Sequence, residues 1–153
     1  MAYPITLIVV GKMKRGSHRE SLEHYRTLLK RFVRLTVVEV AESKKQGAAG
    51  LQEEARKIMQ HLTSTDTVVL LREQGLSLTS VEFAKWLGKK TDLGHSLVFI
   101  IGSSEGLDRS LVQRFGTHLS LSPMTYSHDL AQILWHEQIY RGFSILQGTP
   151  YHK

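Results

Sequence analysis

The ionisable residues that invite a chemical role gather in the last third of the chain. His128 lies near the start of a predicted long helix, and Glu137 lies within that helix. An imidazole can exchange a proton near neutral pH, and a carboxylate can orient or pair with a neighbouring group. A single residue of this kind more often caps a helix or completes a hydrogen bond, so both interpretations stay open.

Other familiar chemical motifs fail on spacing. The eight histidines include no His-Glu-x-x-His and no pair four residues apart, and cysteine is absent, so the pattern disfavours a metal site. Gly11 and Gly16 resemble a phosphate loop but lack the lysine that should follow the second glycine. The segment 102–106 lacks the glycine spacing of a dinucleotide-binding turn, and its serines lack the Gly-x-Ser-x-Gly pattern of an acyl-transfer nucleophile.

Alternating strands and helices must position any site in this chain. Continuous apolar runs and capping patterns set the expected bounds. We expect strands at residues 5–10, 35–40, 67–71, 96–101 and 118–121, and helices at 17–33, 51–62, 79–87, 108–115 and 129–146. Residues 43–50 are predicted to form a mobile loop. This order predicts an α/β fold with a mainly parallel sheet flanked by helices.

Three of the expected strands end in loops that could meet. Ligands of parallel sheets bind at the carboxyl ends of the strands. The loops at 71–75, 102–106 and 122–127 all follow such ends, so their convergence predicts a binding site.

The last helix is apolar over most of its circumference. Leu130, Ile133, Leu134 and Ile145 cover one side, and the opposite side carries Trp135, Ile139, Phe143 and Leu146. A helix of this kind is buried on more than one face. We therefore expect one face to pack on the chain's own sheet and another against a partner subunit.

Bulk properties predict one globular domain spanning residues 1–153. The hydrophobic content of 41% and the charged content of 22% are globular values, and no apolar run approaches the ~20 residues that span a bilayer. No signal peptide is expected, and a cytoplasmic location is predicted.

The net charge of +6 is concentrated in the first third. Residues 11–45 hold ten Lys or Arg and four Asp or Glu, whereas the remainder is balanced. A local basic field suits a polyanion such as nucleic acid, and the alternative is a solvated helix face.

The chain resembles the ribosomal large-subunit methyltransferase H family of the SPOUT superfamily along its whole length. The clearest matches are Leu-Ser-Leu-Ser, Met-Thr and His128, followed by Glu-Gln, Tyr-Arg and the ending Pro-Tyr-His. Further matches are Phe-Ile-Ile-Gly with Glu-Gly-Leu, the opening Ile-Val-Val-Gly-Lys, and the segment 75–84.

The resemblance implies an S-adenosylmethionine-dependent enzyme with a C-terminal trefoil knot, working as a homodimer with its site at the subunit interface. Its expected reaction is methylation of N3 of a pseudouridine in large-subunit (23S) rRNA, without a metal. The residues expected to line the cofactor pocket are Leu71, Gly102, Leu121, Ser122, Pro123, Met124, Thr125 and Tyr126.

The N3 proton must leave before or during methyl transfer, and His128, Arg141 and His152 are the candidates for assisting it. The sequence departs from the family at Arg72, at 103–104, and at Ser127. Two other functions stay open: methylation of another RNA such as tRNA, and non-catalytic RNA binding or ribosome assembly.

Overall fold

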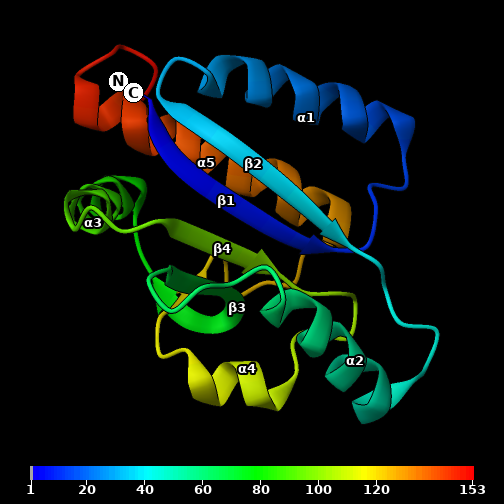
Figure 1. The fold of residues 1–153 in the computed structure, drawn as a ribbon. Helices are drawn as coiled ribbons and strands as arrows, with labels where there is room; N and C mark the ends of the chain where they lie inside the picture. The colour runs from blue at the N-terminus through cyan, green and yellow to red at the C-terminus, as the bar shows by residue number, and fades with distance from the viewer. Residues whose placement is uncertain (1) are drawn as a thin grey trace.

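Five parallel strands form one sheet in the order β2-β1-β4-β3-β5 (Figure 1). The computed structural model describes residues 2–153. The strands are β1 (Tyr3–Val10), β2 (Val33–Val40), β3 (Thr67–Ser77), β4 (Leu97–Ile101) and β5 (His118–Ser120). The helices are α1 (Gly16–Leu29), α2 (Gly47–Met59), α3 (Ser80–Asp92), α4 (Arg109–Arg114) and α5 (His128–Gln147). The predicted α/β class with a parallel sheet is confirmed.

The central strands are buried on both faces, which explains their continuous apolar runs. In β4, Phe99 joins the hydrophobic core beneath α1, α3 and α5, whereas the next residue, Ile100, joins the core beneath α2 and α4. The two groups of helices lie on opposite sides of the sheet (Figure 1). Over residues 2–153, no helix combines the length and apolar character needed to span a membrane.

Strand β3 continues well beyond its predicted end at Leu71. Leu71 pairs with Leu119 of β5, and after a register shift Leu76 pairs with the same residue. Residues 72–75 therefore bulge from the strand pair. Gly75 permits the renewed pairing, because a Cβ at this position would stand 2.7 Å from backbone atoms of β5.

Two predicted helix starts are confirmed in detail. The Thr79 hydroxyl accepts the N–H of Glu82 at 3.2 Å, and the Glu82 carboxylate accepts the N–H of Thr79 at 2.8 Å. Asp108 caps α4 by accepting the N–H of Ser110 at 3.1 Å. Local side-chain chemistry alone defines these boundaries.

Two other predictions near helix starts are wrong. The capping box at Ser17 does not form, because α1 begins with Arg15 at its N-cap and no side chain of its own caps it. The carboxylate of Asp129 supplies the acceptor instead, from the other end of the chain. The loop expected at 43–50 is shorter, since Gly47 already begins α2.

Helix α5 buries three of the four residues expected on one side, whereas Leu146, the fourth, is 42% exposed. The Ser127 hydroxyl accepts the N–H of Leu130 at its start, and Gly148 ends it with a φ of 71°. Its side toward the sheet buries Trp135, Ile139 and Phe143. Leu130 on the other side is 43% exposed, so α5 leaves an apolar face uncovered.

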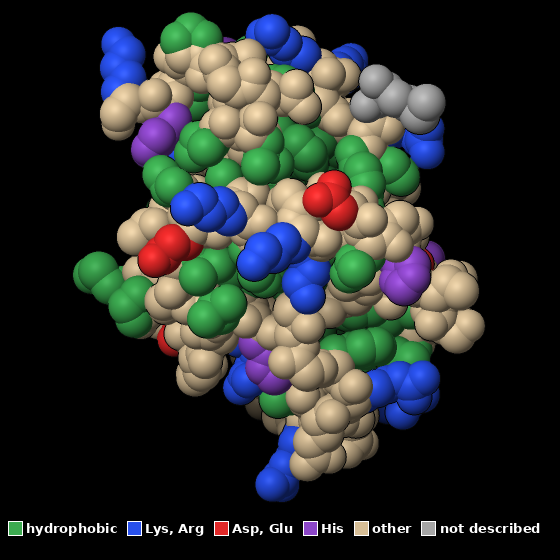
Figure 2. Space-filling model, turned by 90° about the vertical axis from the view of Figure 1, so that its left-hand side faces the viewer, with side chains coloured by type: hydrophobic (Ala, Val, Ile, Leu, Met, Phe, Trp, Pro, Cys, Tyr) green, Lys and Arg blue, Asp and Glu red, His purple; other side chains and the backbone are tan. Residues whose placement is uncertain are grey.

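The N-terminal ends of the strands carry a groove of about 580 Å³ between the ends of α1, α3 and α5. Tyr3, Phe32 and Phe143 contribute aromatic walls to it. Figure 2 shows this end of the molecule, with hydrophobic side chains gathered in a band and basic side chains around them. The groove lies at the opposite end of the strands from their carboxyl termini.

His136 of α5 is a completely buried imidazole. Its Nδ1 lies 2.7 Å from the carbonyl oxygen of Gln132, to which it donates, and its Nε2 accepts from the Arg26 guanidinium at 3.4 Å. Burial lowers the pKa of His136 to about 4 from its usual 6.5. The folded protein therefore holds this ring neutral.

The buried ring predicts a loss of stability in mild acid. Because the folded pKa lies below the unfolded one, stability is complete above pH 6.5 and declines as the pH falls toward 4, by about 3 kcal/mol. Urea unfolding of the wild type and His136→Gln across this range should show a gap that shrinks with acidification. Parallel curves for the two proteins would contradict the assignment.

Candidate functional site

A cavity of about 430 Å³ opens at the carboxyl ends of β3, β4 and β5. The three loops predicted to converge do so: segments from 71–74, 101–107 and 121–126 line the cavity together with His128 and Ala131 of α5. Parallel pairing of the strands brings these segments to one edge of the sheet.

Most of the residues singled out from the sequence border this cavity. These are Leu71, Gly102, Leu121, Ser122, Met124, Thr125, Tyr126 and His128. Pro123 is not among the lining residues, although both of its neighbours are. Arg141 and His152 also lie outside the lining.

The turn after β4 packs too tightly for any residue but glycine at its start. A Cβ at Gly102 would collide with the carbonyl of Gly106. Gly106 itself has a φ of +90° and donates its N–H to the Ser103 carbonyl at 2.9 Å. Glycine at these two positions thus shapes one wall of the cavity.

The loop after β5 is tied to the bulge of β3. The Thr125 hydroxyl donates to the Glu73 carboxylate at 2.8 Å, and the Ser122 hydroxyl accepts the N–H of Met124 at 2.9 Å. Glu73 was not identified from the sequence, because the bulge that presents it leaves no local pattern. Met124 is 72% exposed and Tyr126 is 40% exposed, so this loop presents apolar side chains outward.

The charges of the cavity do not form a phosphate site. Arg72 borders it, but its guanidinium donates to Nδ1 of His118 at 3.1 Å. Glu73 and Glu105 are also in the lining. Hydroxyls, backbone groups and apolar side chains supply the rest, a surface that suits a largely neutral ligand.

His128 lines the cavity and also lies against Gly11 of the loop that follows β1. Its Nδ1 lies 3.4 Å from the Gln132 amide and 3.6 Å from the Asp129 carboxylate. Its Nε2 is buried without a hydrogen-bond partner. A buried, unpartnered ring nitrogen beside a cavity is available to a ligand or to a proton.

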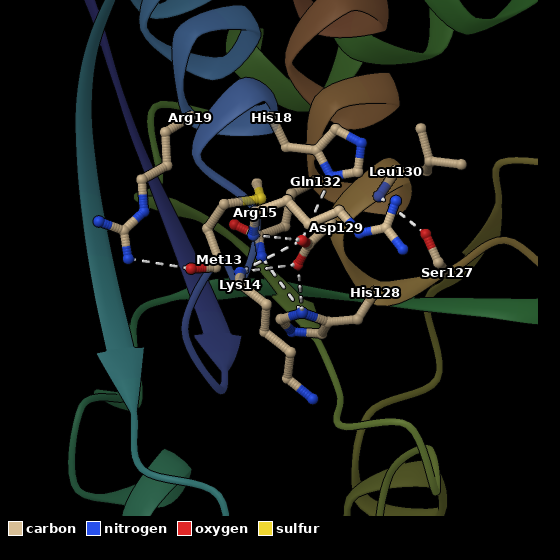
Figure 3. Close-up of polar contacts among 10 residues, drawn as sticks. All are labelled: Met13, Lys14, Arg15, His18, Arg19, Ser127, His128, Asp129, Leu130 and Gln132. Atoms are coloured by element: carbon tan, nitrogen blue, oxygen red, sulfur yellow. Dashed lines mark hydrogen bonds and ion pairs between the residues drawn. The ribbon is translucent and has the colours of Figure 1, made fainter.

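Asp129 connects the start of α5 to the start of α1 (Figure 3). Its carboxylate accepts the N–H groups of Lys14 and Arg15 at 3.2 and 3.3 Å and lies 3.3 Å from Nδ1 of His18. Burial alone raises the pKa of Asp129, but these hydrogen bonds outweigh burial and lower it below its usual value. No local pattern in the sequence marks this residue, because its partners lie over 100 residues away.

Arg141 and His152 form a second polar cluster with Glu137 and Tyr151. The Arg141 guanidinium donates to Glu137 at 2.6 Å and to Nδ1 of His152 at 2.9 Å, and the Tyr151 hydroxyl donates to Glu137 at 3.2 Å. Burial, followed by the charge of Glu137, raises the pKa of Tyr151 to about 12. The C-terminal tail is therefore docked on α5 rather than frayed.

The cluster around Asp129 and His128 and the cluster around Arg141 and His152 lie far apart along α5. At a rise of ~1.5 Å per residue, Arg141 lies about 20 Å along the helix axis from His128. Within one chain, the structure therefore brings His128 to the cavity but leaves Arg141 and His152 far from it. Over residues 2–153, no group of His, Asp and Glu side chains is placed to hold a metal ion.

Comparison with known sequences finds close relatives of similar length. A family model described as a predicted SPOUT methyltransferase matches residues 3–152. Ribosomal RNA large subunit methyltransferase H from Caldicellulosiruptor saccharolyticus is 37% identical, over 97% of this chain and 99% of that protein. The protein of the same name from an Anaeromyxobacter species is 36% identical with the same coverage.

Solved structures share the fold at low sequence identity. A methylase family protein from Haemophilus influenzae superposes with a TM-score of 0.57 and 14% identity, over 97% of this chain and 70% of that one. TrmJ from Z. mobilis gives a TM-score of 0.51 and 15% identity, over 99% of this chain and 73% of that one.

The tight turn after β4 generates a stability prediction. Gly102→Ala should lower the free energy of unfolding by about 1–3 kcal/mol, because the added methyl must displace the Gly106 carbonyl. Gly116→Ala is the matched control, since a Cβ there meets nothing within 4 Å. Denaturant titration should separate the two variants, and equal stabilities would show that the turn yields without cost.

Proposed function

Because this chain belongs to the SPOUT methyltransferases, and within them to the ribosomal RNA large subunit methyltransferase H family, we propose that it transfers a methyl group from S-adenosylmethionine to large-subunit rRNA. The observation that carries this proposal is the three-loop cavity at the carboxyl edge of the sheet. The proposed target is N3 of a pseudouridine, as the family resemblance implies. A cytoplasmic location would follow from a ribosomal substrate.

The character of the cavity supports S-adenosylmethionine as its ligand. Its volume of about 430 Å³ falls in the range of small-molecule sites. Leu71, Leu121 and Met124 supply apolar surface for an adenine ring. Gly102 and Ser122 bring backbone and hydroxyl groups to the same walls. Such recognition suits an uncharged base better than a phosphate cradle.

The demands on the protein are positioning and control of one proton. The bound cofactor supplies an already activated methyl group, so alignment of the acceptor atom provides much of the acceleration. The N3 atom must lose its proton, and His128 is the ionisable group at the cavity with a free, buried ring nitrogen. His128 is therefore proposed to accept that proton or to stabilise the resulting anion.

A homodimer would bring the cluster of Arg141 and His152 in one subunit to His128 at the cavity of the other. Leu130 at the start of α5 and Met124 and Tyr126 in the adjacent loop expose apolar surface that a second copy could cover. If two α5 helices pack antiparallel through this face, the partner's Arg141 and the partner's His152 approach the cavity. The separation of about 20 Å within one chain supports this arrangement.

The cations that would meet RNA lie next to the cavity. Residues 11–15, here named the basic loop, follow β1 and expose Lys12, Lys14 and Arg15. Gly11 of the same loop lies against the His128 ring. Phosphates held by this loop would place the RNA over the proposed site.

The path of the chain after β5 supports the trefoil knot implied by the resemblance. β5 is an edge strand, yet α5 packs between α1 and α3 on the face that covers β1. Residues 121–127 make this crossing alongside the loops after β3 and β4. Threading of the last helix through these loops is proposed as the topology of the site.

Two measurements test the proposed function directly. Calorimetry should detect S-adenosylmethionine binding, which a purely RNA-binding or assembly protein would lack. Tritiated methyl transfer should then label 23S rRNA in ribosomes, in large subunits or as free rRNA. Label on tRNA alone, or no cofactor binding, would overturn the proposal.

The composite site predicts complementation between two inactive subunits. Deleting residues 151–153 should abolish methyl transfer while leaving cofactor binding, since the tail lies outside the chain's own cavity. In the proposed dimer a second copy covers this loop, so Met124→Asp should abolish cofactor binding by placing an unpaired, dehydrated carboxylate against the ligand. A mixed dimer of the two variants should regain up to one working site, measured by tritium transfer after subunit exchange. Demonstrated exchange without recovered activity would exclude a site shared in trans.

The basic loop predicts the salt dependence of RNA binding. Replacing Lys12, Lys14 and Arg15 together with alanine should weaken binding and reduce the slope of log K against log salt by up to about 2, because fewer counterions are released. The matched control replaces Lys30, Arg31 and Arg34 with alanine, which removes the same charge at the far end of α1. Fluorescence anisotropy at several salt concentrations compares RNA binding by the two triple variants. Equal slopes would indicate that the RNA does not bind at the basic loop.

A further inference from the structure

The Asp129 carboxylate holds the basic loop by its backbone. The side chain is only 10% exposed and accepts the N–H groups of two successive residues, Lys14 and Arg15. Asp129 lies in the first turn of α5, while Arg15 is the N-cap of α1. One carboxylate therefore meets the positive ends of two helices, which favours its charged form at this position.

Binding through the backbone leaves the cations of the loop available. The Lys14 and Arg15 side chains are exposed, although their N–H groups are engaged. Buried Met13, just before them in the loop, anchors it, and the Arg19 guanidinium donates to the Met13 carbonyl at 3.0 Å. The loop is thus fixed in place without neutralising the charges that it presents (Figure 3).

The same carboxylate lies beside the proposed catalytic ring. His128 precedes Asp129 in the chain, and its Nδ1 is 3.6 Å from the second carboxylate oxygen. On its other side the ring meets Gly11, where a Cβ would stand 3.6 Å from the ring carbon Cε1. His128 is therefore bracketed between Asp129 and the first residue of the loop that Asp129 holds.

We propose that Asp129 is a positioning residue that fixes the basic loop at the edge of the cavity, so that one carboxylate sets both the RNA phosphate contacts and the place of His128. This inference deepens the proposed function and rests on it, because it assumes that the basic loop meets the substrate RNA. Without the Asp129 bonds, RNA binding would have to order the loop, and the lost backbone freedom would weaken association.

The direction in which RNA affinity changes when Asp129 is replaced separates positioning from simple electrostatics. Removing a negative charge from a protein that binds a polyanion should strengthen binding if the charge acts only through the overall field. Positioning predicts the reverse: Asp129→Asn should bind an rRNA fragment about tenfold more weakly. The slope against salt should stay unchanged, because the three cations remain.

The experiment uses the whole chain, three single variants, and the protein lacking the three loop cations with and without Asp129→Asn. Anisotropy measures RNA affinity for the wild type, Asp129→Asn, Asp129→Ala and Asp66→Asn. The last is the matched control, since Asp66 accepts a single turn N–H, that of Thr63, before β3 and its loss changes the net charge equally. Asp129→Asn is also made in the protein lacking the three loop cations, where it should cause no further loss of RNA affinity. Calorimetry should find S-adenosylmethionine affinity within about threefold of the wild type.

Amide hydrogen exchange provides a readout that does not depend on RNA. Exchange at Lys14 and Arg15 should accelerate in Asp129→Asn, while the core strands stay protected. If Asp129→Asn binds RNA as tightly as the wild type, or more tightly, the positioning role of Asp129 is overturned but the proposed function is not. A further loss in the protein lacking the loop cations would also overturn it. A wild type that binds neither S-adenosylmethionine nor RNA would instead overturn the proposed function.

Discussion

The central strands of the sheet are buried on both faces, so helices must cover each face. The rest of the structure follows from this requirement. β1 and β4 send successive side chains into two separate cores. Each crossover between parallel strands therefore carries a helix to one face or the other. The strands all point the same way, so the loops that follow them gather at one edge. The cavity is the space that these loops leave between them.

Helix α5 connects the cavity to the opposite end of the molecule. Its first residue borders the cavity, and from its midpoint onward it carries the cluster of Glu137, Arg141 and the docked tail. Gly142 lets the helix approach α3 closely, since a Cβ there would stand 3.0 Å from Leu87. A rigid helix packed so tightly cannot bend to bring its two ends together. The distance between the two polar clusters is therefore a fixed property of one subunit.

Much of this arrangement could be predicted because its causes are local in sequence. Apolar runs predicted all five strands, and the capping pattern at Thr79 predicted its helix in atomic detail. The loops that line the cavity were expected because each follows the carboxyl end of a predicted parallel strand. These successes share one cause: each depends on residues within a few positions of one another.

The failures arise where distant residues decide local structure. Helix α1 begins before Ser17, and Asp129 accepts the N–H of its N-cap residue Arg15, so the local box at Ser17 does not form. β3 resumes pairing after Gly75 because β5 offers a partner at that point. Glu73 reaches the cavity through the resulting bulge. Pro123 lies between two lining residues without lining the cavity itself, so its contact with a cofactor stays a prediction.

The order in which the chain is made gives α5 a further consequence. Helix α5 is synthesised after β1–β5 and α1–α4, yet Trp135, Ile139 and Phe143 fill the layer over the centre of the sheet. Helices α1 and α3 both pack against α5, so they cannot close that layer without it. A nascent chain that stops before α5 exposes an apolar sheet face to its neighbours. Premature termination anywhere ahead of α5 would therefore yield an aggregating product and a demand for chaperones, rather than a shortened protein.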